Sequence, residues 1–161
     1  RYVMTEQGVA WVLEDLRRMD GYHTQMASGR VGELGFSADL VLPDRPSEYF
    51  ARNVWIGASF PSPSEADAMK KVGIERMMWG SDYPHNESTF PYNRDHLRRS
   101  FSGWDEADLR KVFAENAAEV YRIDLDALAP LAERIGPSVD EVATPLDEVP
   151  KDAFSPAFTR P

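Results

Sequence analysis

The chain has 161 residues, no cysteine and a formal net charge of −9 at pH 7. The acidic balance argues against a nucleic-acid partner, which would need a basic face, and the lack of cysteine excludes disulfides and thiolate metal ligands. No apolar run approaches the roughly 20 residues of a membrane span, and a cysteine-free chain fits a reducing compartment, so we expect no membrane partner and a cytoplasmic protein.

The first predicted unit is a strand, a tight turn and a helix. Residues 1–5 have the composition of a strand, and Gln7-Gly8 forms the turn. Apolar residues then recur at helical spacing over residues 11–19, and Asp20-Gly21 predicts the end of this helix. Because the chain opens inside a strand, we expect that the sequence is cut from a longer protein.

A long loop separates this unit from the next. Residues 22–47 have no clear period and are rich in Gly and Pro, so we expect a loop that contains at most a short helix. Residues 53–60 then predict a buried parallel strand. Ser62 or Ser64 is expected to cap a helix over residues 65–72, which Gly73 ends.

The third predicted strand places a carboxylate at its end. Residues 77–79 are apolar and break into Gly-Ser-Asp, so Asp82 follows the carboxyl end of a buried strand. Enzymes of the α/β barrel type hold catalytic groups at this point, where a rigid strand meets an open loop. Asp82 could instead stabilise a turn before Pro84. Glu6 has the same place after the first strand. It could act in acid–base chemistry, or it could be a first-turn Glu that the helix dipole favours.

Three further residues near these strand ends are candidates for substrate binding: Trp11, Tyr83 and His85. Trp11 could line a pocket, although an aromatic residue at helical spacing more often packs in the core. His85 follows Asp82 by three residues, so Asp-x-x-His could converge on one ion. We favour the alternative, in which His85 is a loop residue beside the pocket.

The remaining chain predicts two helices that cover the sheet, and then a tail. In the helix over residues 92–101 we expect Leu97 and Phe101 to point inward and His96 to lie on a solvated face beside arginines. The helix that begins at Asp105 carries an apolar stripe, within which Asn116 is expected to bond a neighbouring backbone. Residues 125–135 predict one short helix, and the Pro-rich residues that follow predict a flexible tail.

Two motifs in this order carry a resemblance to a known family. Gly-Ser-Asp-Tyr-Pro-His at residues 80–85, followed by Glu-Asn-Ala-Ala-Glu-Val-Tyr at residues 115–121, resembles the C-terminal part of the amidohydrolase-related family. That family contains metal-dependent hydrolases and decarboxylases of the aminocarboxymuconate-semialdehyde decarboxylase type.

The resemblance implies an α/β fold made of the last three strand–helix units of a TIM-like (β/α)8 barrel, incomplete as given. Residues 1–124 would be the C-terminal part of the barrel, and residues 125–161 a short helix and a flexible tail. It also implies a divalent metal, zinc or else manganese, held by histidines and by Asp82, with Asp82 and Glu6 in catalytic roles.

The family's His-x-His pair does not occur in this sequence. We therefore expect a fragment of an enzyme that hydrolyses or decarboxylates a small carboxylate-bearing substrate and that is inactive alone. Its partner would be an N-terminal half of the barrel, and association into a homo-oligomer is a second alternative. The alternative is a non-catalytic α/β module that associates with itself or with a separate N-terminal half, because an incomplete barrel leaves sheet edges exposed.

Overall fold

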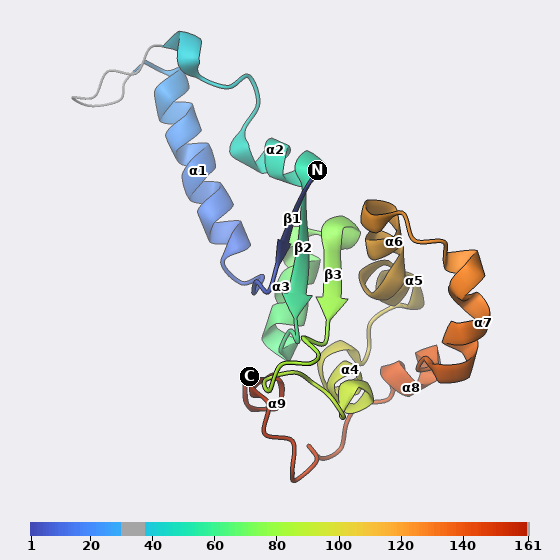
Figure 1. Cartoon of the computed structure of the whole chain (residues 1–161). Helices are drawn as coiled ribbons and strands as arrows, with labels where there is room; N and C mark the ends of the chain where they lie inside the picture. The colour runs from blue at the N-terminus through green and yellow to red at the C-terminus, as the bar shows by residue number, and fades with distance from the viewer. Residues whose placement is uncertain (30–37, 161) are drawn as a thin grey trace.

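A three-stranded parallel sheet forms the centre of the computed structural model, which describes residues 1–29 and 38–160 (Figure 1). The strands β1 (Tyr2–Thr5), β2 (Val54–Ser59) and β3 (Met77–Gly80) lie side by side in chain order. Met4 pairs with Ile56, and Ile56 pairs with Met77. Strands alternate with helices, so the predicted α/β class is confirmed, and the parallel sequential order agrees with part of a TIM-like barrel.

The described residues form helices between and after these strands. They are α1 (Val12–Ala27), α2 (Pro46–Asn53), α3 (Pro63–Val72), α4 (Asn93–Phe101), α5 (Glu106–Arg110), α6 (Asn116–Tyr121), α7 (Leu125–Ile135), α8 (Val139–Ala143) and α9 (Pro156–Thr159). Short 3-10 turns occupy Ala38–Leu40 and Ile74–Arg76, and a π-type turn at Lys111–Glu115 joins α5 to α6. Among the described residues, no helix is both long and apolar enough to cross a bilayer.

The core lies between one face of the sheet and the helices. Ile56 and Met77 are almost fully buried there, together with Leu97 and Phe101 of α4, whose inward orientation was predicted. Asn116 donates through Nδ2 to the carbonyls of Ile74 and Met77, each at 2.7 Å, which confirms the expected bond to a neighbouring backbone. These contacts hold α6 against the start of β3.

Helix α3 ends before Gly73 as predicted, and Ser62, one of the two predicted caps, starts it at Pro63, two residues before the predicted start. The Ser62 Oγ accepts the Glu65 backbone N–H at 3.4 Å, and the Glu65 carboxylate accepts the Ser62 N–H at 3.3 Å, so the two residues form a capping box. Gly73 ends the helix with φ +110°, a conformation that side chains with a Cβ rarely adopt. The cap fixes the chain that leaves β2 for α3.

Helix α1 is longer than predicted, because Asp20-Gly21 does not end it. The Asp20 carboxylate accepts hydrogen bonds from the Ser47 backbone N–H at 3.0 Å and from the Ser47 hydroxyl at 2.7 Å. These bonds lower the pKa of Asp20 and join α1 to the start of α2. Asp20, which was predicted to end the helix, therefore makes a tertiary contact from within it. Residues 30–37 of the predicted loop lie outside the described residues.

The prediction for His96 is wrong, because this residue is fully buried rather than solvated. Its Nε2 donates to the Pro61 carbonyl at 3.1 Å, and its Nδ1 accepts the Trp79 indole N–H at 3.3 Å. The buried stripe of a helix spans about 100°, which is wide enough to include both His96 and the adjacent Leu97. Burial lowers the pKa of His96 to about 4, so the ring is neutral at pH 7.

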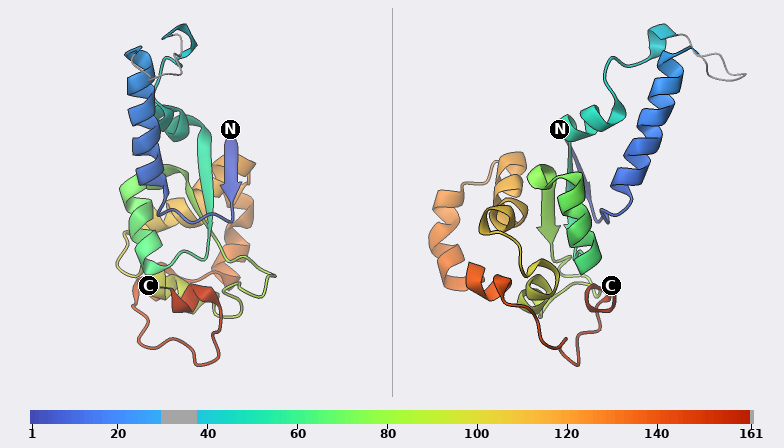
Figure 2. Two further views of the ribbon diagram at one scale, coloured as in Figure 1. Left: turned by 90° about the vertical axis from the view of Figure 1, so that its left-hand side faces the viewer. Right: turned by 180° about the vertical axis from the view of Figure 1, so that it is seen from behind.

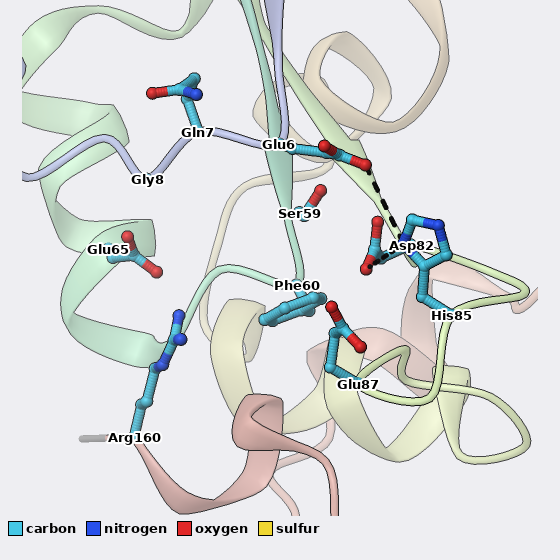
Figure 3. Close-up of a pocket in the computed structure, with 10 residues that line it drawn as sticks. All are labelled: Glu6, Gln7, Gly8, Ser59, Phe60, Glu65, Asp82, His85, Glu87 and Arg160. Atoms are coloured by element: carbon cyan, nitrogen blue, oxygen red, sulfur yellow. Dashed lines mark hydrogen bonds and ion pairs between the residues drawn. The ribbon is translucent and has the colours of Figure 1, made fainter.

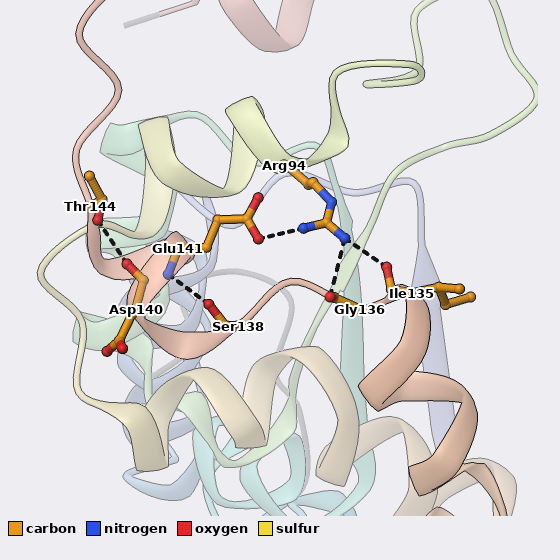
Figure 4. Close-up of polar contacts among 7 residues, drawn as sticks. All are labelled: Arg94, Ile135, Gly136, Ser138, Asp140, Glu141 and Thr144. Atoms are coloured by element: carbon orange, nitrogen blue, oxygen red, sulfur yellow. Dashed lines mark hydrogen bonds and ion pairs between the residues drawn. The ribbon is translucent and has the colours of Figure 1, made fainter.

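The segment after residue 124 returns to the body of the protein (Figure 2). Helix α7 has the predicted residues 125–135, and the Pro-rich residues that follow carry two more short helices, α8 and α9. Arg94 of α4 pairs with Glu141 and donates to the Ile135 carbonyl at 2.8 Å (Figure 4). Arg98 donates to the Thr144 carbonyl at 3.0 Å. Side chains of α4 thus bind the backbone of this segment; a domain boundary at residue 124 stays a prediction.

Candidate functional site

The carboxyl ends of all three strands border one cavity of about 320 Å³ (Figure 3). Glu6 follows β1, Ser59 and Phe60 are at the end of β2, and Asp82 follows β3. Parallel strands present their carboxyl ends at one edge of a sheet, so residues that are 76 positions apart, Glu6 and Asp82, meet in space. The cavity therefore lies at the edge of the sheet where the positions of Glu6 and Asp82 after their strands predict a site.

Each strand is followed by a residue in the left-handed backbone region. The φ angles are 56° at Glu6, 38° at Phe60 and 64° at Asp82. This region costs roughly 1–2 kcal/mol for a residue with a Cβ, although Asp tolerates it better than Glu or Phe. Such conformations concentrate at functional sites, and here all three border the same cavity.

The side chains of Glu6, Asp82 and His85 converge on one point. Their nearest oxygen and nitrogen atoms all lie within 4.8 Å of one another. The His85 Nδ1 lies 3.1 Å from Asp82 Oδ2 and 3.9 Å from Glu6 Oε1. The structure thus brings together the two carboxylates and the histidine that the sequence offered as separate candidates.

The three members of this cluster differ in their exposure to solvent. The Asp82 side chain is 9% exposed, whereas those of Glu6 and His85 are 65% and 56% exposed. The hydrogen bond from His85 to Asp82 raises the pKa of His85, and the nearby carboxylates of Asp82, Glu87 and Glu6 act in the same direction. His85 is therefore held beside Asp82 as an accessible group whose positive charge the neighbouring carboxylates favour.

The donor set of this cluster fits a divalent metal ion. Histidine nitrogen and carboxylate oxygen are ligands of zinc, with bonds of about 2.0–2.2 Å. Two ligand atoms of a tetrahedral site are then roughly 3.4 Å apart, and the separations of 3.1 and 3.9 Å lie on either side of this value. Beyond this cluster, the described residues contain no second group of three such side chains at these separations.

The other two predicted substrate-binding residues lie away from the cavity wall. Trp11 packs against the core, and its indole N–H donates to the Gly8 carbonyl at 2.7 Å. Tyr83 is 64% exposed, and its ring contacts Phe90 at 5.1 Å between centroids. Neither side chain borders the cavity that Glu6 and Asp82 line, so their binding roles stay predictions.

Several residues that line the cavity were not predicted from the sequence. Glu65, Glu87 and Arg160 come from α3, from the loop after β3 and from the end of α9. Glu65 had a signal, because it belongs to the capping box after Ser62. The sequence contains no signal that places Arg160, because this residue follows a Pro-rich stretch that predicts a flexible tail.

Comparison with known proteins identifies one family. The amidohydrolase family matches residues 41–123, just over half of the chain. The matched region contains β2, β3, Asp82 and His85, whereas Glu6 and Arg160 lie outside it. Among curated proteins, a search found no match.

Proposed function

The chain belongs to the amidohydrolase family, and on that premise we propose that Glu6, Asp82 and His85 form part of the metal-binding active site of a hydrolase. The convergence of these three side chains at the carboxyl edge of the sheet supports this proposal. The two-carboxylate, one-histidine donor set suits zinc, with manganese as the second choice.

Each residue of the cluster has a distinct role in this proposal. Asp82 is the principal ligand, because its side chain is the least exposed and it lies two residues after the rigid strand β3. His85 and Glu6 complete the donor set, and Glu6, the most exposed of the three, can also exchange protons with solvent. A divalent ion bound there supplies Lewis-acid polarisation of a substrate oxygen.

The family resemblance supports the reaction class that we propose. Hydrolysis of a C–N, C–O or C–C bond is the activity we propose, with non-oxidative loss of CO₂ as the variant that some relatives perform. The substrate is a small molecule that bears a carboxylate. Because the 161 residues contain no His-x-His pair, we expect this chain to turn over little substrate unless a separate N-terminal half supplies those ligands.

Zinc affinity tests the assignment directly. The protein is titrated with zinc against a chromogenic chelator, and the Asp82→Asn variant is compared with wild type. We expect Asp82→Asn to weaken zinc binding at least about 10-fold, since loss of even an outer-shell partner costs this much. Asp67→Asn is the matched control, because Asp67 is exposed on α3 and its substitution changes the net charge equally.

Equal zinc affinity in wild type and Asp82→Asn would refute Asp82 as a ligand. If the wild-type protein bound no zinc or manganese at all, the non-catalytic α/β module would become the better description of this chain.

A further inference from the structure

The C-terminal segment brings a cation into the cavity that holds the candidate metal cluster. Arg160 directly follows α9, and its side chain lines the same cavity as Glu6 and Asp82 (Figure 3). The guanidinium carbon lies 5.7 Å from the centroid of the Phe60 ring, at the end of β2. Residues from the two ends of the chain therefore share one cavity.

Several contacts fix the position of the backbone that carries Arg160. Arg99 of α4 donates to the Ala157 carbonyl at 3.0 Å and to the Arg160 carbonyl at 2.7 Å. Phe158 is 6% exposed, and its ring packs edge-on against His96 at 6.0 Å between centroids. The α9 segment is thus anchored by two hydrogen bonds from Arg99 and by the buried ring of Phe158.

The start of α9 is tied to the cavity as well. The Ser155 hydroxyl donates to the Glu87 carbonyl, and its oxygen accepts the Ala157 N–H at 3.2 Å, which caps the helix. Glu87 belongs to the loop that carries His85, and it also lines the cavity. The α9 segment and the loop after β3 are therefore linked directly.

The Arg160 guanidinium differs from those of the arginines on α4. Arg94, Arg98 and Arg99 each donate hydrogen bonds to backbone carbonyls. Within the described part of the chain, the Arg160 side chain makes no such bond and no ion pair, although Glu65 and Glu87 line the same cavity. A guanidinium that lines a cavity and has N–H donors free of protein acceptors is suited to bind an anionic ligand.

The charges of the cavity explain why such a cation matters. Four carboxylates line it, those of Glu6, Glu65, Asp82 and Glu87, and the whole chain carries a net charge of −9. An anion entering this field is repelled unless a cation faces it. Arg160 and His85 lie on opposite sides of Phe60 (Figure 3), so Arg160 can hold one end of a molecule whose other end reaches the cluster.

We propose that Arg160 binds the carboxylate of the substrate and thereby determines specificity for small carboxylic acids. The planar guanidinium fork can hold a carboxylate with two parallel hydrogen bonds, which a lysine cannot do. The proposal rests on the proposed function, because the cluster of Glu6, Asp82 and His85 defines the reactive end of the cavity. Arg160 defines the opposite end of the cavity, and the α9 segment that carries it lies outside residues 41–123, which match the family.

Binding of benzoate, with benzamide as its neutral counterpart, tests this role by calorimetry with and without zinc. We expect wild type to bind benzoate more tightly than benzamide. Arg160→Gln should weaken benzoate binding about 10-fold or more, should leave benzamide unchanged and should retain wild-type zinc affinity. Arg160→Lys should recover only part of the loss.

Arg134→Gln is the matched control, because Arg134 is exposed on α7 and its loss lowers the net charge equally. The thermal midpoint of Arg160→Gln should equal that of wild type, since Arg99 bonds the backbone carbonyl that glutamine keeps.

The outcomes separate this inference from the proposed function. If zinc binds but benzoate affinity is the same in wild type and Arg160→Gln, the role of Arg160 is overturned while the metal site stands. If no zinc binds but benzoate affinity still depends on Arg160, the metal site fails and the anion site stands. Equal affinity of wild type for benzoate and benzamide overturns the inference in either case.

Discussion

His85 and Asp82 are joined twice across the turn that follows β3. The His85 backbone N–H donates to the Asp82 carbonyl at 2.9 Å, and the His85 Nδ1 donates to Asp82 Oδ2 at 3.1 Å. The backbone bond fixes the distance between the two residues, and the side-chain bond orients the imidazole toward the cavity. This turn places the titratable imidazole of His85 in hydrogen-bond contact with Asp82, the principal candidate metal ligand.

Zinc binding should therefore depend on pH through His85. A histidine binds a metal only when it is neutral, and the hydrogen bond to Asp82 raises the pKa of His85 above 6.5. Zinc affinity should rise as pH increases from 6 through this raised pKa. Titrations at intervals between pH 6 and 8 measure it, and His85→Gln should bind zinc more weakly with a flatter pH profile.

His23→Gln serves as the control for this experiment, because the His23 Nε2 contacts the Leu42 carbonyl far from the cavity. The stability of the metal-free protein should change with pH in the opposite sense to zinc affinity. The raised pKa of His85 in the folded state stabilises the fold below pH 6.5, and this stabilisation is lost as pH rises through the folded-state pKa. Parallel pH profiles for wild type and His85→Gln would contradict the assignment of His85 as a ligand.

The buried His96 should make the fold sensitive to mild acid. Its pKa is about 4 in the folded protein and about 6.5 when exposed, so the unfolded chain binds more protons between these values. The free energy of unfolding should fall as pH decreases from about 6.5 to about 4, by on the order of 3 kcal/mol. Denaturant titrations along this range measure the loss.

His96→Gln isolates this contribution, because glutamine can still donate to the Pro61 carbonyl but does not titrate. The carboxylates of the chain titrate in both proteins, so the difference between the two pH profiles belongs to His96. A parallel loss of stability in wild type and His96→Gln would show that protonation of His96 does not cause the acid sensitivity.

The sequence predicted the strands and their ends better than the loops, for a physical reason. Strand ends follow from local composition, and parallel strands share one carboxyl edge, so the places of Asp82 and Glu6 at that edge could be predicted. The contact between Glu6 and His85 could not, because it depends on the conformation of a loop. Arg160 was also beyond prediction, since its position comes from tertiary bonds to Arg99.

Single polar residues in helices show the same limit. Asn116 interrupts an apolar stripe, and the bond to a neighbouring backbone that this suggests is present. His96 stands among arginines, which indicates a solvated face, yet Trp79 and Pro61 satisfy its two nitrogens in the core. The local sequence shows which residues of a helix are polar. Whether a polar side chain can be buried depends on the hydrogen-bond partners that the fold places beside it.

Glu6 should be held in its left-handed conformation at a cost to stability. Its φ of 56° disfavours a side chain with a Cβ by roughly 1–2 kcal/mol, and glycine removes this penalty while it loses more chain entropy on folding. Glu6→Gly should therefore be as stable as Glu6→Gln or more stable, by up to about 1 kcal/mol, when both are unfolded in denaturant. Both variants should bind zinc more weakly than wild type.

Comparison with Glu6→Gln separates the backbone effect from the loss of a negative charge beside Asp82. Thr5→Gly is the second control, because Thr5 is in the extended strand β1, where glycine should destabilise by about 1 kcal/mol. If Glu6→Gly lost as much stability as Thr5→Gly, the Glu6 backbone would not be strained. A gain in stability together with weaker zinc binding would mean that the chain keeps a costly conformation at Glu6 because it aims the carboxylate at His85.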